Sequence, residues 1–422
     1  MKRIITPEIL SGKVKVPPSK SLSHRAIIAA SLCEGKSKVD NILFSEDIIA
    51  TLNIMEQFGA QIVRGKDYVI IDGIKDFKIP EKELQCNESG STLRFLIPMG
   101  LLSGGQCTYV GNGKLVSRPI DTYIKILEEQ GIDYKYDGSL PLTLDGTLKA
   151  GDFVVPGNIS SQFITGLLFV LPLLEENSKI IIEGPLESKG YIDLTIDILK
   201  TFGIDILNLN HQEYIIRGGQ KYKARDYYVE GDYSQVAFWI VAGIIGDGIE
   251  IEGINEFSLQ GDRRVLDIVK EMGADLEFKD NNLIVSPSKT KGITIDGSQC
   301  PDIIPVLSVL AALSQGETRV VNGARLRIKE SDRIKSTIDI INRLGGNAVE
   351  TEDGLIIEGK DSLKGGSVDS WNDHRIAMSS AVAAIRCEGK VTITGSSAVN
   401  KSYPTFYEDY TQLGGKVSGE YI

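Results

Sequence analysis

The chain has 422 residues, a formal net charge of −11, and 42% hydrophobic and 24% charged residues. The acidic balance argues against bulk nucleic-acid binding, which needs a basic surface, and the length favours two domains over a single core. No apolar run approaches the roughly 18 residues of a membrane span, and the opening MKRIITPEIL lacks the apolar segment of a signal peptide. The five cysteines are scattered without a CxxC pair, so a reduced, cytoplasmic location is expected.

One pattern recurs six times along the chain: a helix-like run ends at a glycine and continues into a strand-like segment. The glycines are spaced by 69 to 72 residues and lie at Gly59, Gly131, Gly203, Gly273, Gly345 and Gly414. So regular a spacing predicts one supersecondary unit used six times, three in each domain. Each glycine is expected to end its helix in the left-handed conformation.

A second register lies upstream of each glycine, where a polar cluster precedes a nearly continuous apolar run. In chain order the clusters surround Ser21, Ser91, Ser161, Ser234, Asp302 and Asp373. The runs that follow are apolar on all sides, which predicts six buried core helices. A helix N-terminus attracts anions. If the three buried helices of each domain run parallel, their positive ends would face one interdomain cleft. The simpler interpretation is that Ser and Asp only cap these helices.

Cations are concentrated at or just inside these predicted helix starts. They are Lys20, Arg25, Arg94, Arg118, Lys329, Arg333, Arg375 and Lys401. Isolated helices favour cations at the opposite end, so a bound, multiply charged anion would offset the electrostatic cost. Arginine can grip phosphate or carboxylate in a bidentate manner.

Three carboxylates accompany the cations, at Asp302, Glu330 and Asp373. An acid and a base in a cationic pocket are suited to proton transfer, although Asp302 could instead cap the helix that follows it. Metal and nucleotide motifs such as HExxH, GxxxxGK[ST] and GxGxxG do not occur, and there are only three histidines. His24 and His374 each precede an arginine, which is compatible with a substrate contact or with a hydrogen-bonded structural role.

A set of motifs extends over essentially the whole chain in a fixed order. It comprises PPSKSLSHRA, SGSTLRF, SRPID, NISSQF, ESKGYID, GDYSQ, PDIIP, LRIKESDR, NDHRIAMS and NKSYPTF. In this set the chain resembles the 5-enolpyruvylshikimate-3-phosphate (EPSP) synthase family of the enolpyruvyl transferase superfamily.

The resemblance implies an α/β fold of two similar domains. Each would have three βαβαββ-like repeats around buried parallel helices, an inside-out α/β barrel, with the active site in the interdomain cleft. One domain would be discontinuous, formed by residues 1–18 with 229–422, and the other would comprise residues 19–228.

The family transfers the carboxyvinyl group of phosphoenolpyruvate to the 5-hydroxyl of shikimate 3-phosphate and releases phosphate. The implied activity is therefore that of a 3-phosphoshikimate 1-carboxyvinyltransferase, a step of the shikimate pathway toward chorismate and the aromatic amino acids. The implied partners are these two small molecules. No metal or organic cofactor, no nucleic acid and no membrane is expected, and the chain is expected to act as a monomer.

The resemblance also assigns residues, position by position. The shikimate 3-phosphate contacts are Lys20, Ser21, Arg25, Ser160, Ser161, Gln162, Ser188, Asp302 and Lys329. The phosphoenolpyruvate contacts are Lys20, Gly90, Arg118, Gln162, Arg333, Arg375 and Lys401. The catalytic groups are Asp302 as the base on the hydroxyl, Glu330 as a proton-transfer partner near the enol carbon, and Lys20, which borders both substrates.

Two alternatives remain open from the sequence. The first is UDP-N-acetylglucosamine enolpyruvyl transferase, a sister enzyme that carries a reactive cysteine shortly before its RP-x-D motif. Here the loop GNGKLVSRPID has no cysteine, and Cys107 lies too far upstream. The second is a processivity clamp, an acidic ring of repeated βαβ-type units. A clamp would spread Lys and Arg along helix faces, whereas here they are concentrated at helix starts.

Overall fold

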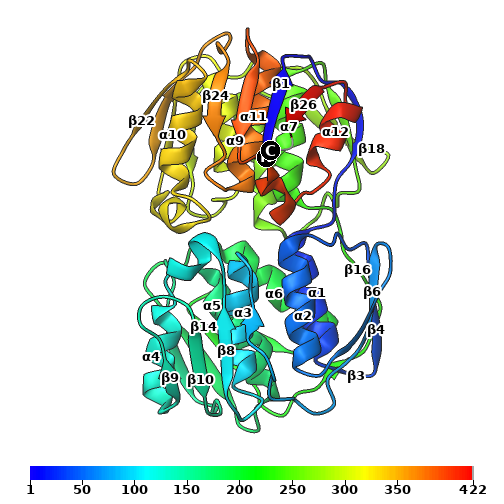
Figure 1. Cartoon of the computed structure of the whole chain (residues 1–422), viewed down its shortest axis with the longest axis vertical. Coiled ribbons are helices and arrows are strands. Elements are labelled where there is room, and N and C mark those ends of the chain that lie inside the picture. The colour runs from blue at the N-terminus through cyan, green and yellow to red at the C-terminus, as the bar shows by residue number, and fades with distance from the viewer. Residues whose placement is uncertain (421–422) are drawn as a thin grey trace. The chain divides into compact units, whose positions relative to one another are not determined.

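The structure is a computed structural model that describes residues 1–420, and it divides into two compact units. The discontinuous unit comprises Met1–Ser19 and Glu230–Ile422, and the continuous unit comprises Lys20–Val229. Both divisions lie one residue beyond the boundaries expected from the sequence. The colours of Figure 1 follow the chain, so the discontinuous unit combines its blue beginning with the green-to-red remainder.

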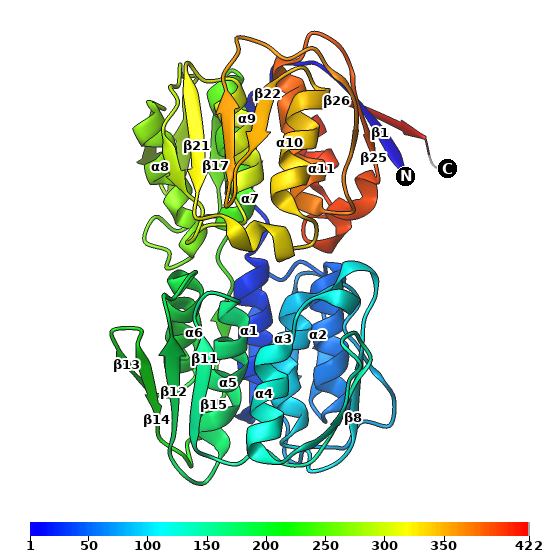
Figure 2. The same cartoon turned by 90° about the vertical axis from the view of Figure 1, so that its left-hand side faces the viewer.

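Three buried helices form the centre of the continuous unit: α1 (Lys20–Ser31), α3 (Gly90–Gly100) and α5 (Ser161–Val170). Their sequences are apolar around the whole circumference, so nearly every side chain beyond the first turn is buried. The residues that follow the three helices, among them Leu32, Leu102 and Leu173, line one hollow. The helices therefore run parallel, with their C-terminal ends together and their N-terminal ends together (Figure 2).

Four-stranded sheets surround these helices, in the orders β16-β4-β6-β5, β7-β8-β10-β9 and β11-β12-β14-β13, and a short pair, β15-β3, is added. The strands are β3 (Cys33–Glu34), β4 (Lys36–Asp40), β5 (Gln61–Arg64), β6 (Tyr68–Asp72), β7 (Leu84–Gln85), β8 (Cys107–Val110), β9 (Asp133–Lys135), β10 (Leu142–Asp145), β11 (Asp152–Pro156), β12 (Ser178–Glu183), β13 (Ile206–Leu209), β14 (Glu213–Ile216), β15 (Tyr222–Lys223) and β16 (Tyr227–Tyr228). In each four-stranded sheet a parallel pair is followed by two antiparallel pairings. The pairs β7–β8 and β11–β12 are parallel because a buried helix crosses over between their strands.

The discontinuous unit repeats this plan. Its buried helices are α7 (Tyr233–Ile245), α9 (Ile304–Ala312) and α11 (His374–Ala383). Its sheets have the orders β18-β19-β17-β2, β20-β21-β23-β22 and β24-β25-β1-β26. The strands are β1 (Lys2–Thr6), β2 (Gly12–Lys15), β17 (Ile249–Glu252), β18 (Leu276–Lys279), β19 (Asn282–Val285), β20 (Thr294–Asp296), β21 (Glu317–Val321), β22 (Asn347–Glu350), β23 (Leu355–Glu358), β24 (Gly366–Asp369), β25 (Val391–Thr394) and β26 (Lys416–Glu420).

A second helix in each repeat ends at the glycine that the sequence singled out. These helices are α2 (Glu46–Gln57), α4 (Asp121–Gln130), α6 (Lys189–Thr201), α8 (Val265–Met272), α10 (Arg333–Arg343) and α12 (Phe406–Gln412). All six glycines have positive φ, from 67° at Gly131 to 115° at Gly59, which confirms the predicted left-handed helix ends. Unlike the central helices, the second helices bury one face: in α10, Ile334, Thr337 and Ile341 are buried, while Lys335 is exposed.

The N-terminal strands explain why one unit is discontinuous. β1 lies between β25 and β26, and β2 pairs in parallel with β17, so both strands complete sheets of the last two hundred residues. The last strand of the continuous unit, β16, pairs with β4 of the same unit, so that unit takes no strand from outside its own residues. Among residues 1–420, no helix is long and apolar enough to cross a membrane.

Candidate active site

In the continuous unit, the first turns of α3 and α5 are joined by side-chain hydrogen bonds. Gln162 Nε2 donates to Ser91 Oγ at 3.0 Å, and Arg94 NH1 donates to Gln162 Oε1 at 2.8 Å. The second guanidinium nitrogen of Arg94 donates to the carbonyl of Pro119 at 3.0 Å, and the guanidinium lies over the Phe163 ring. The amide of Gln162 is thus held in one orientation at the N-terminal ends of two buried helices.

Gly90 makes room for a second guanidinium at the same place. A Cβ atom built on Gly90 would lie 2.6 Å from Arg118 NH1 and 3.5 Å from Gln162 Oε1. Since real side chains do not tolerate 2.6 Å, the absence of a side chain at position 90 allows Arg118 to approach the start of α3. The structure therefore brings together three of the predicted phosphoenolpyruvate contacts, Gly90, Arg118 and Gln162.

Arg25 is a buried cation whose hydrogen bonds lead to neutral oxygens. Its Nε donates to Thr195 Oγ1 at 2.8 Å, and its two other nitrogens donate to the carbonyls of Ser21 at 2.8 Å and Tyr191 at 3.1 Å. The guanidinium also lies over the Phe95 ring, 5.0 Å from its centroid. Burial lowers the pKa of Arg25 to about 10, so the group stays charged at neutral pH and is well suited to hold an anion.

Lys20 and three serines complete the predicted contacts of this unit. Lys20 begins α1, and its Nζ pairs with Asp47 Oδ2 at 2.7 Å. Ser160 caps α5 by accepting from Gln162 N at 3.3 Å, and Ser161 is the first residue of that helix. Ser188 precedes α6 with a φ of 55°, an uncommon conformation for a residue with a side chain. All three serines are buried at helix N-termini, where an anion is stabilised.

In the discontinuous unit, Arg333 binds three carboxylates. Its side chain is 1% exposed, NH1 lies 2.5 Å from Asp302 Oδ1, NH2 lies 2.6 Å from Glu330 Oε2, and Nε lies 2.9 Å from Asp373 Oδ2. Burial alone would lower the pKa of Arg333, but Asp373, Glu330 and Asp302 together raise it well above its ordinary value. One guanidinium therefore fixes the positions of both predicted catalytic carboxylates.

Asp302 faces three cations and does not cap a helix. Its Oδ1 lies 3.4 Å from Lys329 Nζ as well as close to Arg333, and its Oδ2 lies 4.0 Å from Arg375 NH2. Burial would raise the pKa of this carboxyl, but the three cations hold it well below its ordinary value. The N-cap position of α9 belongs to Ile303, which removes the interpretation of Asp302 as only a capping residue.

The remaining cations of this unit contact backbone carbonyls. Arg375 NH1 donates to Ser234 O at 3.0 Å, which joins the N-terminal ends of α11 and α7. Lys401 Nζ donates to Asn372 O at 2.6 Å. Burial lowers the pKa of Lys329, and the neighbouring Asp302 opposes this effect.

Three cations do not lie at the helix starts where the sequence placed them, and for these three the prediction is wrong. Arg118 and Lys329 are the C-caps of the 3₁₀ helices Gly113–Ser117 and Ala324–Ile328, and Lys401 is the last residue of the 3₁₀ helix Ser396–Lys401. α4, α10 and α12 begin later. A cation is electrostatically favoured at a helix C-terminus, so these three residues do not carry the cost that was inferred for them.

Two residues considered in the sequence analysis, His24 and Cys107, have structural roles. His24 is buried within α1, its Nδ1 lies 2.8 Å from Thr51 Oγ1, and burial lowers its pKa well below the ordinary value. Burial also raises the pKa of the Cys107 thiol, so Cys107 is no reactive nucleophile. Within residues 1–420, no three His, Cys, Asp or Glu side chains are grouped in a way that could hold a metal ion.

Several partners were not singled out as site residues from the sequence: Asp47, Thr195 and Tyr191, which hold Lys20 and Arg25, and Arg94, which orients Gln162. Arg94 could have been found from the sequence, because it is one of the cations at the predicted helix starts. The others come from neighbouring helices and lack a local signature.

Solved structures share this architecture. The enolpyruvyl transferase NikO from Streptomyces tendae superimposes with a TM-score of 0.77 at 17% identity, over 99% of this chain and 98% of the other, which shows an enolpyruvyl transferase fold. An EPSP synthase from Acinetobacter baumannii superimposes with a TM-score of 0.83 at 30% identity, over 99% of this chain and 100% of the other. The predicted two-domain α/β fold class is thereby confirmed.

The family itself follows from the sequence comparisons. The family model described as EPSP synthase (3-phosphoshikimate 1-carboxyvinyltransferase) matches residues 4–410. A 3-phosphoshikimate 1-carboxyvinyltransferase from Clostridium novyi strain NT is 52% identical over 421 residues, covering 97% of each chain. The chain belongs to the EPSP synthase family. These findings do not favour the sister enzyme that uses UDP-N-acetylglucosamine, and they give no support to a processivity clamp.

Proposed function

We propose that the chain transfers the carboxyvinyl group of phosphoenolpyruvate to the 5-hydroxyl of shikimate 3-phosphate and releases phosphate. The observation that carries this proposal is the carboxylate of Asp302, held among Lys329, Arg333 and Arg375 beside Glu330. Such an arrangement provides two carboxylates for proton transfer within a cationic environment. Membership of the EPSP synthase family supplies the substrates.

Shikimate 3-phosphate is assigned mainly to the continuous unit. Arg25 and Lys20 supply charge, while Ser160, Ser161 and Ser188 supply hydroxyls at helix N-termini for the phosphate. A phosphate that binds near Arg25 would give this buried cation an anionic partner in place of neutral oxygens, which is a favourable exchange. The proposal assigns Lys329 and Asp302 to the hydroxyl-bearing ring.

Phosphoenolpyruvate is assigned to Arg118, Gln162, Arg375 and Lys401, with Gly90 leaving space. Both substrates are anionic and repel each other in water, and clustered cations offset that repulsion. Arg333 has two roles in this proposal, because it also binds Asp302, Glu330 and Asp373. We therefore expect Arg333 to set the carboxylates as well as to border phosphoenolpyruvate.

The chemistry needs one proton delivered and one removed at the enol methylene carbon. In the addition step, that carbon gains a proton, and the 5-hydroxyl oxygen forms a bond to the neighbouring carbon while losing its own proton. In the elimination step, the bond from that carbon to the phosphate oxygen breaks, and the methyl group returns a proton. Asp302 is proposed to receive the hydroxyl proton, and Glu330 and Lys20 to exchange protons at the methylene carbon.

The low pKa of Asp302 bears on its role as a base. A carboxylate stabilised by Lys329, Arg333 and Arg375 is a weak base. Anionic phosphoenolpyruvate shares the field of the same cations once it binds, which raises the pKa of Asp302 toward the working pH. Asp302 is thus a stronger base when phosphoenolpyruvate is bound than in the free chain.

A coupled phosphate-release assay tests the proposal. The purified chain should release phosphate only when phosphoenolpyruvate and shikimate 3-phosphate are both present, and UDP-N-acetylglucosamine should not replace the latter. Asp302→Asn should lower turnover by about 100-fold or more and leave shikimate 3-phosphate binding, followed by calorimetry, within a few-fold. Asp267→Asn, which changes an exposed carboxylate of α8, is the matched control. Normal turnover in the Asp302 variant would remove this residue from the mechanism.

We infer further that the enzyme is cytoplasmic and monomeric. The five cysteines are free and buried, as suits a reducing compartment. Light scattering at the concentration of the assay should give the mass of one chain, and a concentration-independent dimer would contradict the second inference.

A further inference from the structure

A tight turn connects β24 to α11 in the discontinuous unit. Asp373 N donates to Ser370 O at 2.9 Å, and the two central residues, Trp371 and Asn372, have φ values of 53° and 52°. Two positive φ values in succession are typical of a type I′ turn, which favours glycine, asparagine and aspartate. Asn372 fits this preference and Trp371 does not, so the tryptophan must be held in this conformation by contacts outside the turn.

The turn presents two groups to the candidate active site. The carbonyl of Asn372 accepts a hydrogen bond from Lys401 Nζ at 2.6 Å. The carboxylate of Asp373 accepts from Arg333 Nε at 2.9 Å and from Ser331 Oγ at 3.0 Å. Because the direction of the Asn372 carbonyl is set by the backbone of the turn, the position of the Lys401 ammonium depends on that backbone.

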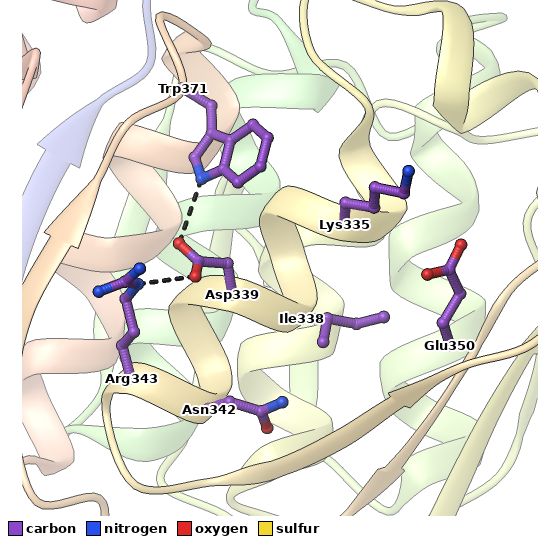
Figure 3. Close-up of a pocket in the computed structure, with 7 residues that line it drawn as sticks. All are labelled: Lys335, Ile338, Asp339, Asn342, Arg343, Glu350 and Trp371. Carbon is purple, nitrogen blue, oxygen red and sulfur yellow. Dashed lines mark hydrogen bonds and ion pairs between the residues drawn. The ribbon is translucent and has the colours of Figure 1, made fainter.

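Two contacts hold Trp371: its backbone N donates to Asp369 Oδ1 at 2.6 Å, and its side chain contacts the middle of α10. Its Nε1 donates to Asp339 Oδ2 at 3.2 Å, and Asp339 Oδ1 accepts from Arg343 Nε at 2.6 Å (Figure 3). The same helix begins with Arg333. The indole and α10 border a hollow of about 530 Å³, and Trp371 as a residue is 40% exposed, so packing alone does not account for a tryptophan here.

We propose that Trp371 is a positioning residue that fastens the turn Ser370–Asp373 to α10 through Asp339 and thereby places the Lys401 ammonium. The effect on phosphoenolpyruvate rests on the proposed function, whereas the effect on the Lys401 amine does not. Without the indole N–H, the turn relaxes from its left-handed conformation, the Asn372 carbonyl turns away, and Lys401 loses this acceptor.

Two variants separate the hydrogen bond from the backbone. Trp371→Phe keeps an aromatic ring and loses the N–H, while Trp371→Asn adopts positive φ readily and loses the ring. Phe257→Ala removes an aromatic side chain that is 81% exposed elsewhere in the same unit and is the matched control. Thermal unfolding of all variants shows whether each is folded.

The first measurement does not depend on activity. Acylation of lysines is followed by mass spectrometry, with exposed Lys270 as the internal reference. Trp371→Phe should label Lys401 about tenfold faster than the wild type, as expected for the loss of one charge-assisted hydrogen bond. Trp371→Asn, which favours the left-handed turn without the indole, should label Lys401 near the wild-type rate, and so should Phe257→Ala. Equal labelling of Lys401 in the wild type and Trp371→Phe would overturn the proposal.

The second measurement divides the two substrates. In the phosphate-release assay, Trp371→Phe should raise KM for phosphoenolpyruvate about tenfold and leave KM for shikimate 3-phosphate within twofold, while Trp371→Asn should keep both values near those of the wild type. Equal increases for both substrates would indicate a general structural defect and would also overturn the proposal. A wild type without activity would contradict the proposed function. The labelling result would still show whether Trp371 positions the Lys401 ammonium.

Discussion

Arg333 shows how one residue can hold a whole group of carboxylates in place. Its guanidinium joins carboxylates from three places: Asp302 before α9, Glu330 before α10, and Asp373 at the N-cap of α11. Lys329 and Arg375 lie farther from Asp302, at 3.4 Å and 4.0 Å, so with Arg333 bound to the three carboxylates they can still attract an incoming anion. The same holds for Lys401, whose ammonium contacts a backbone carbonyl. A buried arginine with three acidic partners holds them in fixed geometry and prevents their mutual repulsion.

Gly90 leads to a prediction at the same scale. Gly90→Ala places a methyl group 2.6 Å from Arg118 NH1, so the guanidinium must move away from the start of α3. We expect KM for phosphoenolpyruvate to rise by roughly 10- to 100-fold, equivalent to about 1.4–2.8 kcal/mol, while KM for shikimate 3-phosphate changes little. Steady-state kinetics with each substrate varied in turn measures both values.

Gly297→Ala is the control for this substitution, because its Cβ would meet neighbouring atoms at 3.4 Å or more. Kinetics of the Gly297 variant should match the wild type. If Gly90→Ala also left KM for phosphoenolpyruvate unchanged, Arg118 would not belong to that site.

Asp262 gives the stability of the chain a pH dependence of its own. Burial and the neighbouring charge of Asp302 raise the pKa of Asp262 to about 6, against the effect of Ser234 and Arg375, while Asp232 adds to the rise. A carboxyl whose pKa is raised by folding binds its proton more tightly in the folded state. Its stabilising contribution is therefore complete below the unfolded value near 4, and it is lost as the pH rises through 6.

The comparison with Asp262→Asn isolates this effect. Between pH 4 and pH 8 the unfolding free energy of the wild type should fall by about 2–3 kcal/mol relative to the variant, as measured by urea denaturation. Asp275→Asn, which removes an exposed carboxylate, should keep a constant difference from the wild type. A difference independent of pH for Asp262→Asn would mean that the folded chain leaves this pKa unchanged.

At the scale of elements, the features that could be predicted are those that short stretches of the sequence determine. The six buried helices follow from runs that are apolar on every side, and their partners end at glycines because glycine adopts positive φ without strain. Both signals lie within a dozen consecutive residues, so they could be found without knowledge of the tertiary structure. The convergence of helix starts within each unit follows from the same register, once the three helices run parallel.

Other features depend on residues far apart in the chain and could not be predicted. The 3₁₀ helices that carry Arg118, Lys329 and Lys401 span only five or six residues and lack a periodic pattern. The partners of Asp302 lie up to 73 positions away, at Arg375. Likewise, no local signal marks Trp371 as the residue that connects the turn before α11 to the middle of α10.

At the scale of the whole molecule, the separate position of β1 and β2 in the chain makes the two units unequal as folding units. Every strand of the continuous unit lies within Lys20–Val229. The discontinuous unit needs β1 to join β25 with β26 and β2 to cover the edge of β17. Without β1, the sheet β24-β25-β1-β26 would lose its third strand and leave β26 without a partner, with unpaired backbone groups along both neighbours.

This asymmetry predicts different behaviour for separate fragments. Residues 20–229 expressed alone should unfold cooperatively on heating, because their core and sheets are complete. Residues 230–422 alone should lack a cooperative transition, and joining residues 1–19 to them through a flexible linker should restore it. Circular dichroism during a thermal scan measures each case. If the fragment 230–422 unfolded as cooperatively as the linked form, the core of this unit would form without the N-terminal strands. The two strands would then not be needed for the stability of the discontinuous unit.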